Sequence, residues 1–236
     1  MDIVENSMLI GYVSGNSIDR TFMESVISFM SYDAQNRHQV LGLATKHGFF
    51  VDDNRNALVR QFLATPAEWL LTIDTDTSFE ATAPYVLFDA AKAKEAKIMA
   101  ALQFSFLDNG SCRPVWFTPA KNGEVTHLGK LTFGELYELA AAGLGLALIH
   151  RTVFEAFLKI PEWRNDSWTW FGRDKYGLVG DTAHLGEDVT FCQRAKTLGF
   201  QTWGHAGCIA AHAKRWQIGF EEFSILYKAN YKGVQE

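Results

Sequence analysis

The segment Leu70-Leu71-Thr72-Ile73-Asp74-Thr75-Asp76 decides how the rest of the chain is interpreted. Its apolar residues form a run typical of a buried strand, and the run ends in two carboxylates one residue apart. In open α/β sheets, ligands bind beyond the carboxyl ends of the strands. Two carboxylates there can hold a hard divalent ion whose other positions go to phosphate oxygens and water. A nucleotide diphosphate fits this chemistry, although a bare Asp-x-Asp is also a common polar turn.

Strand-length apolar segments alternate with helix-length amphipathic segments on both sides of this run. We expect strands at 8–14, 40–45, 69–73, 98–104, 143–149, 200–203 and 208–212, and helices at 21–31, 82–94, 152–158, 187–198 and from a cap at Asp52, Asp53 or Asn54 to Ala64. Asn122-Gly123 lies between apolar segments, which predicts a short hairpin with a primed turn. The pattern predicts an α/β fold with a mostly parallel central sheet flanked by helices and a small additional hairpin or sheet.

Composition favours one domain in a reducing compartment. No repeat, low-complexity tract or proline-rich linker divides the 236 residues. The formal charge of -5 argues against a broad basic surface for nucleic acid, although it allows a local basic groove. Three cysteines are too few for a disulfide framework or a four-cysteine zinc site, so we expect a cytoplasmic setting.

Neither membrane insertion nor export is indicated by the sequence. No apolar run approaches the roughly 20 residues that a membrane-spanning helix needs. The N-terminus lacks the basic segment followed by an apolar stretch that is typical of a secretory signal. We therefore expect that the protein neither spans a membrane nor is exported.

Four stretches occur in an order that resembles the GT-A glycosyltransferases, in particular the small family-2-like enzymes of bacteria and phages. They are 12–17; Asp-Asp-Asn-Arg-Asn at 52–56 with 69–76; 143–151; and Gly-Glu-Asp-Val-Thr-Phe-Cys at 186–192 with 199–200. The resemblance implies a single GT-A domain, with nucleotide-sugar binding in about 1–105 and acceptor binding in about 106–236. It also implies a cytoplasmic enzyme of a bacterium or a phage-infected cell.

The resemblance assigns a metal and the donor diphosphate to the Asp-x-Asp motif. In the family this motif binds a divalent cation and a sugar nucleotide, which places Mn²⁺ or Mg²⁺ and a UDP- or GDP-sugar on Asp74 and Asp76, with Asp76 the more direct metal ligand. The family often adds a late histidine, and here His205 and His212 are the two choices. A hydrogen-bonded structural role is the alternative for either histidine.

We favour His212 as the metal-binding histidine. It follows a strand-like segment and precedes Lys214 and Arg215, whose charges can meet the donor phosphates.

The resemblance places the nucleotide near the first strand and the second helix. The base or ribose would lie on the loop made of Val13, Ser14, Gly15 and Asn16, although Gly15-Asn16 alone indicates only a turn. Arg55 and Arg60 would contact the nucleotide side of the donor, because a planar guanidinium suits a diphosphate. Solvation of the helix is the alternative for both arginines.

Glu187 and Asp188 fall in the first turn of an expected helix, where the helix dipole favours negative charge. The resemblance implies a catalytic role at this position in inverting members, with Asp188 as the base and Glu187 beside it. An alcohol is a poor nucleophile at neutral pH, so the acceptor hydroxyl needs such a base. The sequence does not decide between inversion and retention, and the base role holds only for inversion.

The irregular segment 161–185 is rich in aromatic residues and glycine. A segment of this length without regular structure usually covers a site, so we expect a lid. Trp168, Trp170 and Phe171 could stack on a sugar, but large aromatic residues are more often core, which is the interpretation we favour.

The combined features predict a metal-dependent glycosyltransferase that moves a sugar from a nucleotide-diphosphate sugar to an acceptor hydroxyl. The acceptor, a glycan, a protein or a modified DNA base, and the oligomeric state stay open. One alternative is a non-catalytic sugar- or nucleotide-binding module of the same fold. Another is a nucleotidyltransferase, which we would expect to carry a glycine-rich loop with positive charge that 12–20 lacks.

Overall fold

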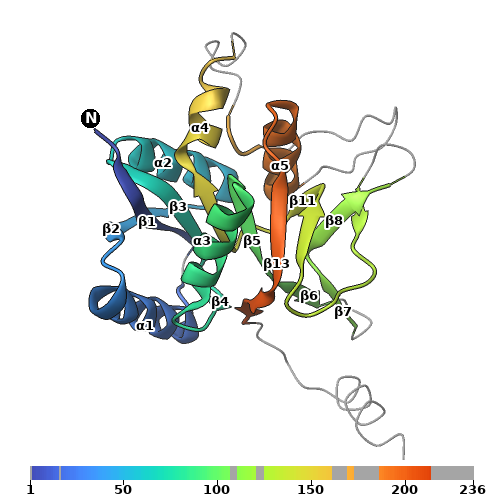
Figure 1. The fold of residues 1–236 in the computed structure, drawn as a ribbon, viewed down its shortest axis with the longest axis horizontal. Coiled ribbons are helices and arrows are strands. Elements are labelled where there is room, and N and C mark those ends of the chain that lie inside the picture. Colours follow the sequence, from blue (N-terminus) through green and yellow to red (C-terminus); the bar gives the residue numbers. More distant parts are fainter. Residues whose placement is uncertain are drawn as a thin grey trace, which may run out of the picture.

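A seven-stranded sheet with helices on both faces forms the centre of the molecule (Figure 1). The computed structural model describes residues 2–15, 17–106, 111–120, 125–160, 169–172 and 186–213. The strand order is β10-β13-β5-β12-β3-β1-β2. One direction is shared by β1 (Val4–Ser14), β2 (Val40–His47), β3 (Ala67–Asp74), β5 (Ile98–Leu102) and β13 (Thr202–Ile209), while β12 (Leu146–His150) and β10 (Leu136–Leu139) run against them. The predicted α/β class with a mostly parallel sheet is confirmed.

Two apolar clusters, one on each face, hold the helices to the sheet. Met8 and Ile10 of β1 share a cluster with apolar residues of α1 (Arg20–Asn36) and α3 (Ala83–Lys94). Leu9, which lies between them in a strand of period two, belongs to the other cluster with α2 (Val51–Leu63), α4 (Arg151–Phe157) and α5 (Glu187–Thr197). Helices therefore cover both faces, as a mostly parallel sheet requires.

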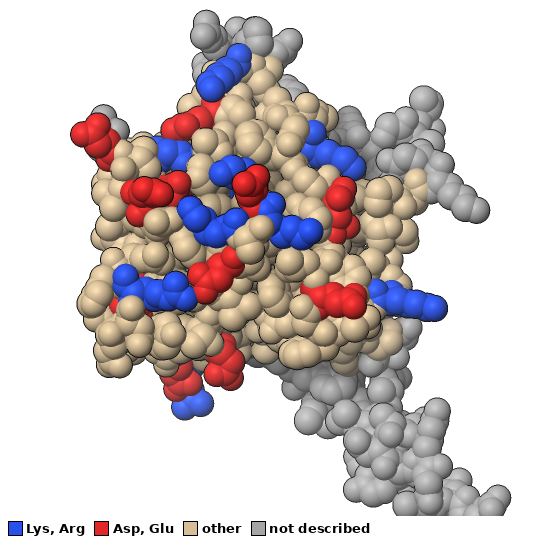
Figure 2. Space-filling model, in the orientation of Figure 1, with Lys and Arg blue, Asp and Glu red and all other residues tan. Residues whose placement is uncertain are grey.

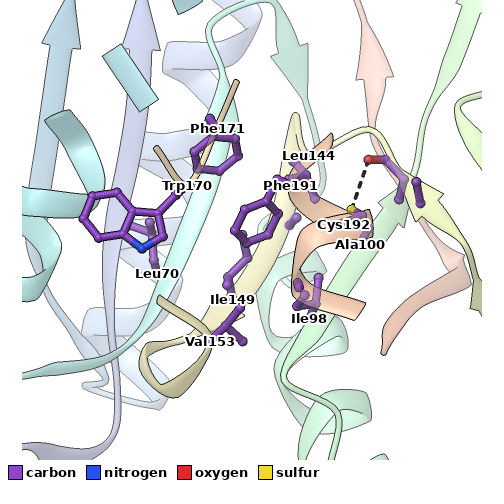
Figure 3. Packing of buried hydrophobic residues seen from close by; sticks show 14 of the residues in the cluster. Leu70, Ile98, Ala100, Leu144, Ile149, Val153, Trp170, Phe171, Phe191 and Cys192 are labelled. Atoms are coloured by element: carbon purple, nitrogen blue, oxygen red, sulfur yellow. Dashed lines mark hydrogen bonds between the residues drawn. The ribbon is translucent and has the colours of Figure 1, made fainter. Parts of the chain in front are cut away.

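Aromatic rings fill the cluster on the α2 side (Figure 3). Phe191 of α5 stacks on Phe171 with ring centroids 4.6 Å apart and on Phe157 of α4 at 5.9 Å. Trp170 is also buried, and its indole N–H donates to the backbone oxygen of Phe154 at 3.0 Å. The expectation that Trp170 and Phe171 are core is confirmed, while Trp168 lies outside the described residues.

The helix starts agree with the sequence except at α2. Asp19 caps α1, since its side chain accepts from the Thr21 N–H at 2.8 Å. The expected cap of α2 at Asp52, Asp53 or Asn54 is wrong, because α2 begins at Val51 and its capping position, Phe50, makes no side-chain bond. The two aspartates instead lie inside the first turn, where the helix dipole favours their charge.

Short strands outside the seven-stranded sheet form three small additional sheets in the described part of the chain. The predicted hairpin is confirmed by β8 (Trp116–Pro119) pairing with β9 (Val125–His127), and its Asn122-Gly123 turn lies outside the described residues. β11 (Ala141–Ala142) joins β8, and β6 (Phe104–Phe106) pairs with β7 (Cys112–Pro114). The pair of β4 (Thr77–Ser78) with β14 (Ala211–His212) positions the candidate site.

The expected boundaries of the last two strands, 200–203 and 208–212, are wrong. The structure has β13 at 202–209 and β14 at 211–212. β13 pairs in parallel with β5 from Thr202 opposite Ile98 to His205 opposite Ala101, with a register shift before Ile209, which lies opposite Leu102. Its residues alternate between buried and partly exposed, so His205 takes a partly exposed position within a strand. Of the expected lid at 161–185, only 169–172 are described. All three cysteines are free.

Candidate functional site

The Asp-x-Asp motif lies at the carboxyl edge of the sheet, where β3 ends. Asp74 is the last residue of β3, and Asp76 lies in the turn before β4. Thr77 of β4 pairs with His212 of β14, and the Ala213 N–H donates to the Asp76 backbone oxygen at 2.7 Å. This pairing brings the His212 imidazole to the Asp76 carboxylate, with Nε2 and Oδ2 2.6 Å apart. Two of the sequence-predicted site residues are therefore neighbours.

A cavity of about 460 Å³ opens beside Asp76. It lies between the start of α1 and the Asp-x-Asp turn, and its walls are Ser17, Ile18, Asp19, Arg20, Thr75, Asp76 and Ala213. The walls are held together by a backbone bond from Asp19 N–H to Thr75 oxygen at 2.9 Å. The cavity therefore lies between the segment that follows β1, the turn that follows β3 and the residue that follows β14.

Arg55 of α2 lies at the centre of an acidic group. Its side chain is 4% exposed, and its Nη2 lies 2.9 Å from Asp74 Oδ1 and 3.5 Å from Asp188 Oδ1. Its Nε lies 3.6 Å from Glu187 Oε1 and makes no hydrogen bond within the described structure. Burial lowers the pKa of Arg55, but the three carboxylates outweigh it and raise that pKa above its ordinary value. Arg55 is therefore a permanent cation that ties β3 to the start of α5.

Asp188 occupies an environment that disfavours its charge. Its side chain is 21% exposed. Burial raises the pKa of Asp188 above its ordinary value, and the nearby Glu187 and Asp74 raise it further, whereas Arg55 and a hydrogen bond from the Leu144 N–H at 3.0 Å oppose this. A carboxyl with a raised pKa can accept and return a proton near neutral pH.

Two residues that sequence reasoning missed shape the same site. Gln103 follows β5, and its side-chain oxygen accepts from the Gly145 N–H while its amide donates to Thr77 Oγ1, both at 3.2 Å. Gly145 precedes β12 and accepts from the Asp74 N–H at 2.8 Å. Gln103 thereby links the end of β3 to β4 across the Asp-x-Asp turn. The glycine-rich run at 143–145 was the only signal for this close approach.

The other sequence-predicted residues lie at different distances from this group. Val13 pairs with Asp74 in the sheet, and Ser14 and Gly15 follow it, but none of them lines the cavity. Arg60 is exposed in the last turn of α2, with its guanidinium 6.0 Å from the Trp170 ring, so the structure does not bring it to the site. Asn16, Lys214 and Arg215 lie outside the described residues.

His205, the alternative metal-binding histidine, has a structural environment. Its Nδ1 accepts from the Gly207 N–H at 3.0 Å. Burial lowers the pKa of His205 below its ordinary value, which favours the neutral ring. The structure brings His212, and not His205, to Asp76.

The side chains at the Asp-x-Asp turn provide a small set of donors for a metal ion. Among the described residues, no group of three or more His, Cys, Asp or Glu side chains is arranged to hold an ion. Asp76 supplies a carboxylate oxygen, a donor that suits Mg²⁺ and Mn²⁺, and His212 supplies an imidazole nitrogen, a donor typical of later transition metals. Asp74 is instead turned to Arg55, so the structure does not join it to that pair. The described residues offer these two ligands, and the remaining positions would be left for phosphate oxygens and water.

Charge on the outer surface is mixed. Figure 2 shows positive and negative side chains intermingled on the face in view, so this face carries no broad basic area for a nucleic-acid backbone. In the described part of the chain, no helix combines the length and the apolar character needed to cross a bilayer.

The architecture and the site at the carboxyl edge define a GT-A-like α/β fold, and solved structures share it. A197 from STIV matches with a TM-score of 0.52 and 18% identity, over 89% of this chain and 86% of that one. GalNAc-T7, solved with UDP, GalNAc and Mn²⁺, matches with a TM-score of 0.54 and 12% identity, over 89% of this chain and 44% of that one. No protein-family model and no curated protein matches the sequence. The GT-A-like fold is confirmed, and the finer resemblance to family 2 stays a prediction.

Proposed function

We propose that this protein is a metal-dependent glycosyltransferase that moves a sugar from a nucleotide-diphosphate sugar to an acceptor hydroxyl. The observation that carries the proposal is the contact of Asp76 with His212 at the rim of the 460 Å³ cavity. A neighbour of the same fold was solved with UDP, GalNAc and Mn²⁺, which supports a nucleotide sugar as donor and a divalent cation as its partner. The cavity has the size of a small-molecule site.

Asp76 and His212 would hold Mn²⁺ or Mg²⁺ in this proposal, and the cavity would hold the UDP or GDP part of the donor. The bound cation would offset negative charge on the departing diphosphate. Most of the cavity wall comes from residues before 105, which supports donor binding in 1–105 and leaves 106–236 for the acceptor. Arg20 lies at the start of α1 and lines the cavity, so its positive charge could bind a donor phosphate.

Asp188 is the proposed base, for a reaction that inverts the sugar. The acceptor O–H would give its proton to Asp188 as the oxygen bonds to the anomeric carbon. The bond from that carbon to the diphosphate oxygen breaks, and its electron pair leaves with the nucleoside diphosphate. The raised pKa of Asp188 supports this role, because a base works best when its pKa is near the working pH. Arg55 and Glu187 are positioning residues, since Arg55 contacts Asp188 and Glu187 contacts Arg55.

The test is calorimetric titration of UDP and GDP with and without Mn²⁺, followed by a transfer assay with a panel of nucleotide sugars. Asp76→Asn and His212→Ala should each weaken Mn²⁺-dependent nucleotide binding at least about tenfold, which is ~1.4 kcal/mol. His205→Gln is the matched control and should bind as the parent does. Binding without any sugar hydrolysis or transfer would identify a non-catalytic module, and metal-independent binding would reject the proposed role of the cation.

A further inference from the structure

Helix α1 has a second apolar face besides the one that packs on the sheet. Phe22, Val26 and Phe29 are buried against the sheet. Met23, Ile27, Met30 and Ala34 follow the spacing i, i+4, i+7, i+11, which places them in one row on a different side of the helix. The first three are 39%, 57% and 40% exposed. Met, Ile and Ala in one row without a charged residue are typical of a contact surface and not of a solvated helix face.

This row faces the free edge of the sheet. On the opposite flank of α1, Ser25 accepts from the Phe79 N–H and Tyr32 lies 5.9 Å from the Tyr85 ring, so that flank faces β4 and α3. The row with Met23 and Ile27 therefore points away from them. In the sheet order the elements on that side are β1 and then β2, and Figure 1 shows α1 and β2 at the same side of the molecule.

Strand β2 continues the apolar surface. It is the last strand of the sheet among the described residues, so its outer backbone groups have no neighbouring strand there. Leu43 pairs with Ile10, which belongs to the cluster under α1, so Leu43 lies on the α1 face, and it is 41% exposed. We call Met23, Ile27, Met30, Ala34 and Leu43 the α1–β2 strip.

The features that protect most edge strands are absent from the middle of β2. Proteins usually limit edge pairing with charged side chains, proline or a very short strand. β2 has eight residues, and its first six, Val-Leu-Gly-Leu-Ala-Thr, contain neither charge nor proline. Such an edge is a template for a further strand.

We propose that the α1–β2 strip is a homodimer interface, in which β2 of two copies pair antiparallel about a two-fold axis. A two-fold axis makes one edge strand complementary to itself and brings each α1 row against its symmetry mate. The strip has no charged residue, so it does not suit a nucleic acid or an anionic membrane surface.

The dimensions of the strip are sufficient for a specific dimer. β2 spans ~26 Å at ~3.3 Å per residue, and α1 spans ~25 Å at ~1.5 Å per residue. A strand and a helix side by side are ~20 Å wide, so each copy contributes on the order of 500 Å², close to the lower size of specific interfaces. The dimer would join two sheets into one, with β10 of each copy at the outer edges, and it does not depend on the proposed transfer reaction.

Sedimentation velocity of the full chain over a wide concentration range tests the proposal. The parent is expected to show twice the 26.5 kDa mass of one chain at high concentration. Ile27→Lys and Leu43→Lys each bury a charge in the interface and should raise the dimer dissociation constant at least about a hundredfold. Ser28→Lys is the matched control, because it adds the same charge on α1 outside the row and should leave the dimer intact.

A cross-linking measurement tests the strand pairing itself. Leu43 lies near the middle of β2, so Leu43→Cys in a Cys112→Ser background should form a disulfide between two copies under mild oxidation, while Ser28→Cys should not. Circular dichroism confirms that each variant is folded. A chain that stays monomeric at all concentrations overturns the proposal, as does a dimer that persists in both lysine variants.

Discussion

Gly145 lies so close to Asp74 that the protein has no room for a side chain at that position. A Cβ atom on Gly145 would lie 2.7 Å from Asp74 Oδ2 and 2.6 Å from Gln103 Nε2. The Asp74 N–H also donates to the Gly145 oxygen, so the two residues cannot simply separate. A glycine here is thus a requirement of close packing at the carboxyl edge and not of backbone conformation.

Gly145→Ala is therefore expected to destabilise the protein by about 1–3 kcal/mol, the usual effect of adding a methyl to a filled interior. It should also displace Asp74 and Gln103 and weaken nucleotide binding. The measurement is urea unfolding together with nucleotide titration. Gly15→Ala serves as the control, because a Cβ there meets nothing within 4 Å, and it should unfold like the parent.

Arg55→Met is expected to cause a larger loss, because it leaves three carboxylates together without their cation. Removing one partner of a buried ion pair costs about 3–5 kcal/mol. The loss in unfolding free energy should shrink as pH falls, because protonation of Asp188, whose pKa is raised, removes one of the three negative charges around the lost cation. Arg60→Met, on the exposed side of the same helix, should change stability little. Equal losses in the two variants would contradict the central role of Arg55.

The pH dependence of stability reports on Asp188. Its pKa is raised from 3.8 to about 7 in the folded protein, with burial the main cause. A raised folded pKa means that the stabilising contribution of the protonated acid is complete below about 4 and is lost as pH rises through about 7. Asp188→Asn resembles the protonated form. The melting temperature of the variant should therefore rise relative to that of the parent as pH increases across this window. A constant difference between the two proteins would show that the pKa is not raised.

The same titration should appear in the proposed transfer reaction. Only the ionised Asp188 can take the acceptor proton, so the rate should rise with pH up to about 7 and then level off. Asp188→Asn should lose turnover while keeping Mn²⁺-dependent nucleotide binding.

Elements with a strong period were predictable from sequence, and contacts between distant segments were not. The run ending at Asp74 identified β3 and its polar end, and the Glu187-Asp188 pair identified the start of α5. The resemblance to a known family called for a late histidine, and the place of His212 after a strand-like segment and before two basic residues favoured it over His205. The resemblance assigned Arg55 to the nucleotide, and local sequence showed its charge but not its burial, which arises only when Arg55 meets Asp74 of β3 and Glu187 of α5. Gln103 was missed because a lone amide after a strand carries no periodic signal.

The side chain of Asn56 fixes the aromatic segment at 169–172. Its amide donates to the Phe171 oxygen at 2.8 Å, and its side-chain oxygen accepts from the Phe171 N–H at 3.0 Å. Asn56→Ala would leave both buried backbone groups without partners, so unfolding free energy should fall by about 1–3 kcal/mol. Asn56→Asp keeps the acceptor and loses the donor, and hydrogen exchange at Phe171 should therefore stay slower than in Asn56→Ala. Unchanged exchange in Asn56→Ala would show that the stacking of Phe171 on Phe191 is sufficient to hold the segment.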